Sequence, residues 1–199
     1  MNDAGVRPFS IRALLEDRAR YLVPMYQRNY AWGEGEITQL LQDVLDYQQK
    51  LVSGKGPQTY YIGTLVVFAR DDGSFEVIDG QQRFTTLSLL ANWLKHHAID
   101  SVDMSWYQTI NLAFESRPIS SHTFERLWQG VAPYDLRGST FNEGLVNGFE
   151  LIDKAMADLG LVGAKLTAFC DYLFKHVQIS RIEVPKDTDL NHFFEAINN

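Results

Sequence analysis

The chain has 199 residues, enough for one well-packed domain or two small ones. Hydrophobic residues make up 45% and aromatic residues 13%, so we expect the chain to fold rather than stay disordered. The formal net charge of −7 argues against a broad basic face that grips DNA regardless of sequence, although a local basic groove stays open.

Targeting and redox features are few. The one cysteine, Cys170, excludes an internal disulfide. It lies among apolar residues at helical spacing, which favours a buried inert thiol over a nucleophile. The first residues lack the basic and apolar regions of a signal peptide, and no apolar run reaches membrane-spanning length. We therefore expect a cytoplasmic protein with no membrane partner.

The first third of the chain alternates short elements with a dense loop. Ser10 is placed to cap a short helix, and residues 21–23 read as a strand that Pro24 stops. Residues 25–32 are rich in aromatic and amide side chains without a clear period, which indicates a structured loop. Apolar residues at helical spacing predict an amphipathic helix over 37–48.

A hairpin leads into the next helix. Residues 60–69 are nearly continuous in apolar side chains, which predicts a strand buried on both faces. The Asp71-Asp72-Gly73 turn and a return strand over 74–78 follow. After the Asp79-Gly80 turn, apolar residues recur at helical spacing, so a helix is expected as far as His97.

Beyond His97 the pattern is mostly helical. We predict helices over 105–115, 121–129, 143–159 and 166–177, and a final strand over 178–184. Asp187 or Asp189 is placed to cap a last helix. Because no terminator follows Asn199, we expect the natural chain to continue past it.

The junction at Asp79-Gly80 carries the strongest chemical signal. Gly80 tolerates a positive φ, and the next residues begin a helix, whose free N–H groups and positive dipole end suit an anion. Arg83 adds a fork of donors that matches phosphate, and Thr85 and Thr86 add hydroxyls in the first turn. The alternative is an ordinary turn in which Arg83 pairs with a surface carboxylate.

Two motifs in a fixed order resemble a known family. Asp-Gly-Gln-Gln-Arg runs from Asp79 to Arg83, and Pro-x-Tyr-Gln-Arg-x-Tyr-x-Trp runs from Pro24 to Trp32. With the Ile62–Val67 strand between them, they resemble the N-terminal domain of GmrSD-type modification-dependent restriction enzymes. The end of the chain, residues 193–199, is similar to the start of a third family motif that normally continues into Arg-Gly.

The resemblance implies an α+β fold of the ParB/sulfiredoxin-like superfamily. It would comprise a small mixed sheet with helices as a nucleotide-binding core over 1–98, and a mostly helical extension with a returning strand over 99–199 of the same domain. It implies binding and hydrolysis of a nucleoside triphosphate of unspecified base, with Mg²⁺. It also implies DNA as a target of the full-length protein, with cutting by a C-terminal nuclease domain or partner subunit. A homo-oligomer is left open, and this chain shows no nuclease motif of its own.

Site roles follow from combining the residues with the resemblance. Gly80 would let the backbone approach the phosphates, and Arg83 would neutralise charge at the β- and γ-phosphates. Asp79 would hold Mg²⁺ or orient the attacking water, or merely cap the turn. The remaining expected contacts to phosphate, ribose, base or Mg²⁺-bound water come from Gln81, Gln82, Thr85, Thr86, Gln27, Arg28 and Tyr26. Of these, Gln82 is counted with Asp79 and Arg83 as catalytic.

Some assignments stay open. Tyr26, Tyr30 and Trp32 either stack on a base or pack in the core. Two functions are consistent with these features: a nucleoside triphosphatase domain of a DNA-targeting defence protein, or a ParB-like DNA-binding module that uses nucleotide only as a switch. The sequence specifies neither the base nor the DNA feature that is sensed.

Overall fold

The structure is a computed structural model and describes residues 5–192. Its six-stranded sheet has the order β1-β6-β3-β4-β2-β5. β1 pairs with β6 and β3 with β4 in antiparallel fashion, while the other three neighbouring pairs are parallel. The strands are β1 (Val6–Ser10), β2 (Tyr21–Val23), β3 (Tyr60–Ala69), β4 (Phe75–Asp79), β5 (Leu112–Phe114) and β6 (Val177–Glu183).

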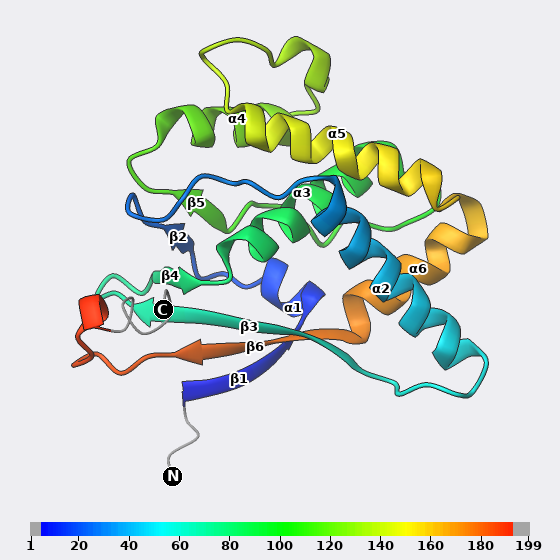
Figure 1. The fold of residues 1–199 in the computed structure, drawn as a ribbon, viewed down its shortest axis with the longest axis horizontal. Coiled ribbons are helices and arrows are strands. Elements are labelled where there is room, and N and C mark those ends of the chain that lie inside the picture. Colours follow the sequence, from blue (N-terminus) through cyan, green and yellow to red (C-terminus); the bar gives the residue numbers. More distant parts are fainter. Residues whose placement is uncertain (1–4, 193–199) are drawn as a thin grey trace.

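Helices gather on one side of this curved sheet, as Figure 1 shows. They are α1 (Ile11–Leu15), α2 (Glu34–Val52), α3 (Gln81–His97), α4 (Pro118–Trp128), α5 (Glu143–Asp158) and α6 (Gly163–Lys175), with a 3₁₀ turn at Pro133–Asp135. The expected α+β class is confirmed. None of the helices in residues 5–192 is long and apolar enough to cross a membrane.

The hairpin and the returning strand form where the pattern placed them. β3 and β4 pair through the turn at Asp72 and Gly73, and Ser10 caps α1 by accepting a hydrogen bond from Ala13 N at 3.1 Å. β6 inserts between β1 and β3, so the second half of the chain supplies an interior strand of the sheet. β1 was not predicted from the sequence, because Arg7 and Pro8 interrupt its short apolar pattern.

The prediction of a helix over 105–115 is wrong. That stretch is a loop that ends in β5, which pairs with β2. Asn111 explains the difference, because its side chain donates to the carbonyls of Leu14 and Asp17, at 2.8 and 3.0 Å, and its own carbonyl accepts from Tyr21 N. The hydrogen bonds of Asn111 are therefore made with partners 90 or more residues away and not within a local helical turn. The last helix, expected after Asp187 or Asp189, lies largely outside the described residues.

α3 is the central element of the core. Thirteen of its side chains are buried, on every face of its first four turns. The spacing predicted one apolar face, whereas α3 lies between the sheet and α5. Polar side chains such as Ser88 and Thr86 accordingly donate to carbonyls one turn earlier, Phe84 O and Gln82 O. Cys170 is buried in α6, and burial raises the pKa of its thiol to about 12.

A second, smaller apolar cluster lies apart from the main core. It consists of Val66 of β3, Ile78 of β4 and Val184, which directly follows β6, with Phe68, Ile182 and Leu190 packed against it. These strand residues alternate with the side chains that face the helices. Leu190, from the segment after β6, therefore sits on the sheet beside the end of β4.

Candidate functional site

The start of α3 is an open helix N-terminus. Gly80 is its N-cap, with φ of +95°, and it makes no side-chain cap. Phe84 N donates to Gly80 O, so the N–H groups of Gln81, Gln82 and Arg83 precede the first intrahelical hydrogen bond. A Cβ on Gly80 would lie 2.9 Å from the carbonyl oxygen of Thr64. Glycine at this position thus lets the helix start press against β3.

Arg83 lies against a bulge in β3. The pairing of β3 with β6 shifts register between Tyr61 and Thr64, and Gly63 in this bulge has φ of +129°. A Cβ on Gly63 would lie 2.6 Å from Nη1 of Arg83 and 3.2 Å from its Cζ. The guanidinium of Arg83 therefore occupies the space that any other residue at Gly63 would fill.

The two adjacent glutamines hold the loop between β2 and α2. Gln82 accepts a hydrogen bond from Ala31 N at 2.7 Å and donates to Asn29 O at 3.1 Å. Gln81 donates to Arg28 O at 2.8 Å. Both side chains are buried, at 4% exposed for Gln81 and 8% for Gln82. Each amide donates one of its two N–H groups to the loop backbone, and both residues also line the cavity described below, so their contact with phosphate or ribose stays a prediction.

Other contacts fix the same loop from both sides. Gln27 donates to Ile78 O at 2.8 Å, and the guanidinium of Arg117 donates to the carbonyls of Met25 and Gln27. Tyr30 is buried beneath α5, and its hydroxyl lies 2.8 Å from Thr86 Oγ1. Burial raises the pKa of Tyr30 to about 12, so it packs in the core as a neutral phenol.

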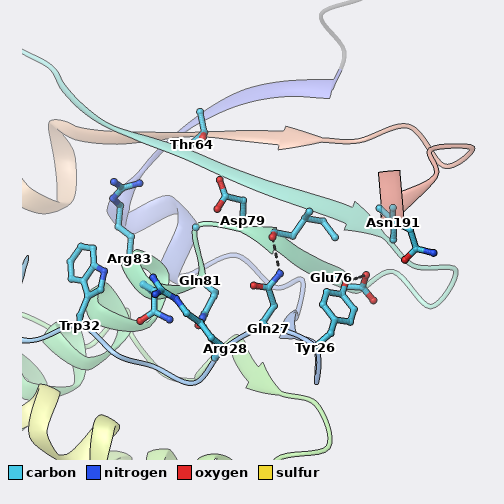
Figure 2. Close-up of a pocket in the computed structure, with 14 residues that line it drawn as sticks. Tyr26, Gln27, Arg28, Trp32, Thr64, Glu76, Asp79, Gln81, Arg83 and Asn191 are labelled. Atoms are coloured by element: carbon cyan, nitrogen blue, oxygen red, sulfur yellow. Dashed lines mark hydrogen bonds between the residues drawn. The ribbon is translucent and has the colours of Figure 1, made fainter. Parts of the chain in front are cut away.

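A cavity of about 1130 Å³ opens beside this loop. Figure 2 shows Arg83 and Trp32 at one end of it and Tyr26, Glu76 and Asn191 at the other, with Asp79 between. The lining residues come from the loop, β3, β4, the start of α3 and the segment after β6, and they are Tyr26, Gln27, Arg28, Trp32, Thr64, Glu76, Ile78, Asp79, Gly80, Gln81, Gln82, Arg83, Leu190 and Asn191.

Charges around the cavity divide into paired and unpaired groups. Glu76 accepts from Arg70 at 2.6 Å and from the hydroxyl of Tyr26 at 2.7 Å, so its charge is balanced. Within residues 5–192, the side chains of Arg28, Arg83 and Asp79 have no hydrogen bond or ion pair. Two free cations and a helix start thus face one free carboxylate, and this balance favours an anionic ligand.

Two expected contacts do not reach the cavity. Thr85 is 0% exposed and Thr86 is 2% exposed, and neither lines it. Thr86 donates to Gln82 O at 2.8 Å and meets Tyr30, on the side of α3 that faces the helices. Both residues are therefore buried away from the cavity in this structure, and contact of their hydroxyls with a ligand or its bound water stays a prediction.

Several lining residues were not expected from the sequence. Thr64 and Glu76 belong to strands whose pairing brings them to the cavity, and nothing in their local pattern marks them. Leu190 and Asn191 reach it because β6 runs beside β3. Gly63 does not line the cavity but lies against Arg83, and it did carry a signal, since a glycine inside an apolar strand indicates a bulge or a close approach.

The metal-binding capacity of the cavity is small. Within the described part of the chain, no group of three His, Cys, Asp or Glu side chains is placed to hold a metal ion. Asp79 is the carboxylate at the cavity that has no partner there, so it suits a cation that takes most of its ligands from water and a bound anion.

Fold and cavity together define an α+β domain with a polar cavity at a strand–turn–helix junction. The sequence matches the family model for the GmrSD restriction endonuclease, N-terminal domain, over residues 11–199. The chain therefore belongs to this family, and the resemblance carried by the Asp79–Arg83 and Pro24–Trp32 motifs is confirmed. No curated protein matches the chain.

Proposed function

We propose that this domain binds a nucleoside triphosphate and hydrolyses it as the nucleotide-dependent part of a bacterial DNA-targeting restriction protein. The observation that carries this proposal is the pair of arginines, Arg83 and Arg28, that have no hydrogen bond or ion pair within residues 5–192 and lie beside the start of α3, which has no side-chain cap. A cluster of free guanidinium groups and backbone N–H groups is the usual protein site for phosphate.

The triphosphate lies along the first turn of α3. Gly80 leaves the backbone open to the phosphate oxygens, and Arg83 and Arg28 place positive charge on either side of them. The apolar surface of Ile78 and the ring of Tyr26, at the end away from Arg83, receive the nucleoside. Ile78 lines the cavity with its side chain, and its carbonyl accepts the hydrogen bond from Gln27. This residue therefore joins β4 to the loop.

Hydrolysis needs a water molecule placed in line with the terminal phosphoanhydride bond. The attacking water forms the new P–O bond, the bond to the β-phosphate oxygen breaks, and inorganic phosphate and a nucleoside diphosphate leave. Asp79 orients this water or would hold Mg²⁺, and Arg83 stabilises the charge that develops on the leaving oxygen. Mg²⁺, when bound, supplies further positive charge at the phosphate oxygens.

Calorimetric titration with ATP, GTP, CTP and UTP in Mg²⁺ tests the binding step. We expect Arg83→Ala to weaken binding by roughly 2–5 kcal/mol, since it removes one partner of a charge-assisted contact. Arg137→Ala is the matched control, because Arg137 is exposed and pairs with Glu150 outside the cavity. Equal affinity of Arg83→Ala and the wild type would reject the site. Binding without any phosphate release would favour the ParB-like switch instead.

A further inference from the structure

We propose that Gly63 is a positioning residue for Arg83, and this inference rests on the nucleotide site proposed above. All three of the nearest atoms to a Cβ built on Gly63 belong to the guanidinium of Arg83, at 2.6, 3.2 and 3.4 Å. The bulge in β3 and the φ of +129° turn the bare backbone of this glycine toward the start of α3.

The space left by the missing side chain of Gly63 holds the guanidinium of Arg83 by steric fit. Most partly buried arginines are held by a carboxylate, which fixes the side chain but also balances its charge. Arg83 is half-buried and has no ion pair within residues 5–192. A flat guanidinium lying on a glycine backbone is restricted in position while its charge stays available to a ligand.

The same strand also receives the helix start. Gly80, three residues before Arg83, approaches the carbonyl oxygen of Thr64, the neighbour of Gly63. Two glycines with positive φ thus bring the first turn of α3 onto the bulge of β3. Gly63 and Gly80 together set where the guanidinium of Arg83 stands relative to the free N–H groups of the helix.

Gly63→Ala tests the positioning role, with inorganic tripolyphosphate as the probe in calorimetric titration. The atoms in the way are the end of a flexible side chain, so we expect the guanidinium to be displaced and the variant to fold, with a loss of stability because alanine is strained at a φ of +129°. Affinity should fall at least tenfold. Gly73→Ala is the matched control, because Gly73 also has a positive φ, +87°, and a Cβ there meets nothing within 4 Å. Its affinity should equal that of the wild type.

A double-mutant cycle separates positioning from a general structural defect. If Gly63 acts through Arg83, then Gly63→Ala should change affinity less than about twofold once Arg83 is already alanine. An equal loss in both backgrounds would overturn the inference. So would full affinity of Gly63→Ala when Arg83→Ala binds weakly.

Arg83→Lys serves if Gly63→Ala does not fold. Lysine keeps the charge but has no planar group to lie over Gly63. We expect Arg83→Lys to bind tripolyphosphate as weakly as Arg83→Ala, and affinity close to the wild type would overturn the positioning role. Failure of the wild-type domain itself to bind either tripolyphosphate or nucleotide would overturn the proposed function along with this inference.

Discussion

At the scale of single residues, one of the side chains that line the cavity also holds its wall in place. This side chain is Gln82. Its amide makes two hydrogen bonds to the loop backbone, at Ala31 N and Asn29 O, and the residue is 8% exposed. Arg28 and Trp32, which flank these contacts, line the cavity. The order of the loop therefore depends on the amide of Gln82, which also lines the cavity.

Gln82→Leu should lower both stability and nucleotide affinity. The leucine leaves two backbone groups of the loop without partners, at a cost of roughly 1–3 kcal/mol in the free energy of unfolding. Urea unfolding measures this cost, and calorimetry with ATP and Mg²⁺ measures the affinity. Gln39→Leu is the control, since Gln39 is exposed and bonds only Asp43. Stability equal to that of the control would show that the two hydrogen bonds of Gln82 to the loop contribute nothing to the free energy of unfolding.

At the scale of elements, one tyrosine joins the loop to the helical layer. Tyr30 fits under α5 because Gly144 and Gly148 have no side chains there. A Cβ on Gly148 would lie 2.6 Å from Cε1 of Tyr30 and 3.2 Å from Cδ1 of Leu89, while a Cβ on Gly144 would meet the carbonyl of Tyr30. The loop that lines the cavity is thus packed against α5 as well as α3.

Gly148→Ala should destabilise the domain, because the ring of Tyr30 is buried, hydrogen-bonded and unable to move aside. Overpacking of this kind costs roughly 1–3 kcal/mol. Gly35→Ala is the matched control, since it is also a helix glycine, in α2, and a Cβ there meets nothing within 4 Å. The control should gain roughly 0.4–1 kcal/mol in urea unfolding. Two variants that are equally stable would show that Tyr30 is loosely packed.

Local patterns were sufficient for elements whose partners are close in sequence. The hairpin of β3 and β4 and the start of α3 were predicted, since turn residues and apolar spacing mark them directly. The segment before β5 was mispredicted because Asn111 bonds to backbone groups 94 and 97 residues away. No local pattern contains that information.

The same limit applies to the cavity. The sequence nominated ten residues, of which Thr85 and Thr86 do not line the cavity, and Gln81 and Gln82 line it while they bond the loop backbone. The other six also line it: Asp79, Gly80, Arg83, Gln27, Arg28 and Tyr26. It could not tell that Gln82 bonds Ala31 N and Asn29 O of the loop, because an amide suits phosphate and backbone equally well. Nor could it place Leu190, whose position follows from the insertion of β6 between β1 and β3. Whether the six residues act on a nucleotide stays a prediction.

At the scale of the whole molecule, the charge balance limits what this domain does alone. Its 18 Lys and Arg are outnumbered by 25 Asp and Glu. Nonspecific DNA binding depends on neutralising phosphates, so any affinity of residues 1–199 for DNA should be weak and fall steeply with salt.

We expect no DNA cleavage by residues 1–199, on plain, glucosylated or phosphorothioated DNA, with nucleotide and either Mg²⁺ or Mn²⁺. Gel analysis of the incubated DNA checks this expectation. Nicking that co-purifies with the domain and is lost in Asp79→Ala would show that the nuclease activity lies in the cavity described here.

Steady-state phosphate release is the most direct measurement of the central claim, that the cavity at the start of α3 hydrolyses nucleoside triphosphates. Purified wild type, Arg83→Ala and Asp79→Asn would be compared at saturating nucleotide with Mg²⁺, with Arg137→Ala as the control. We expect release by the wild type and the control, and a loss of at least tenfold in both cavity variants, because each removes a group that acts on the reacting phosphate. No release by the wild type, or equal release by all four proteins, would contradict the claim.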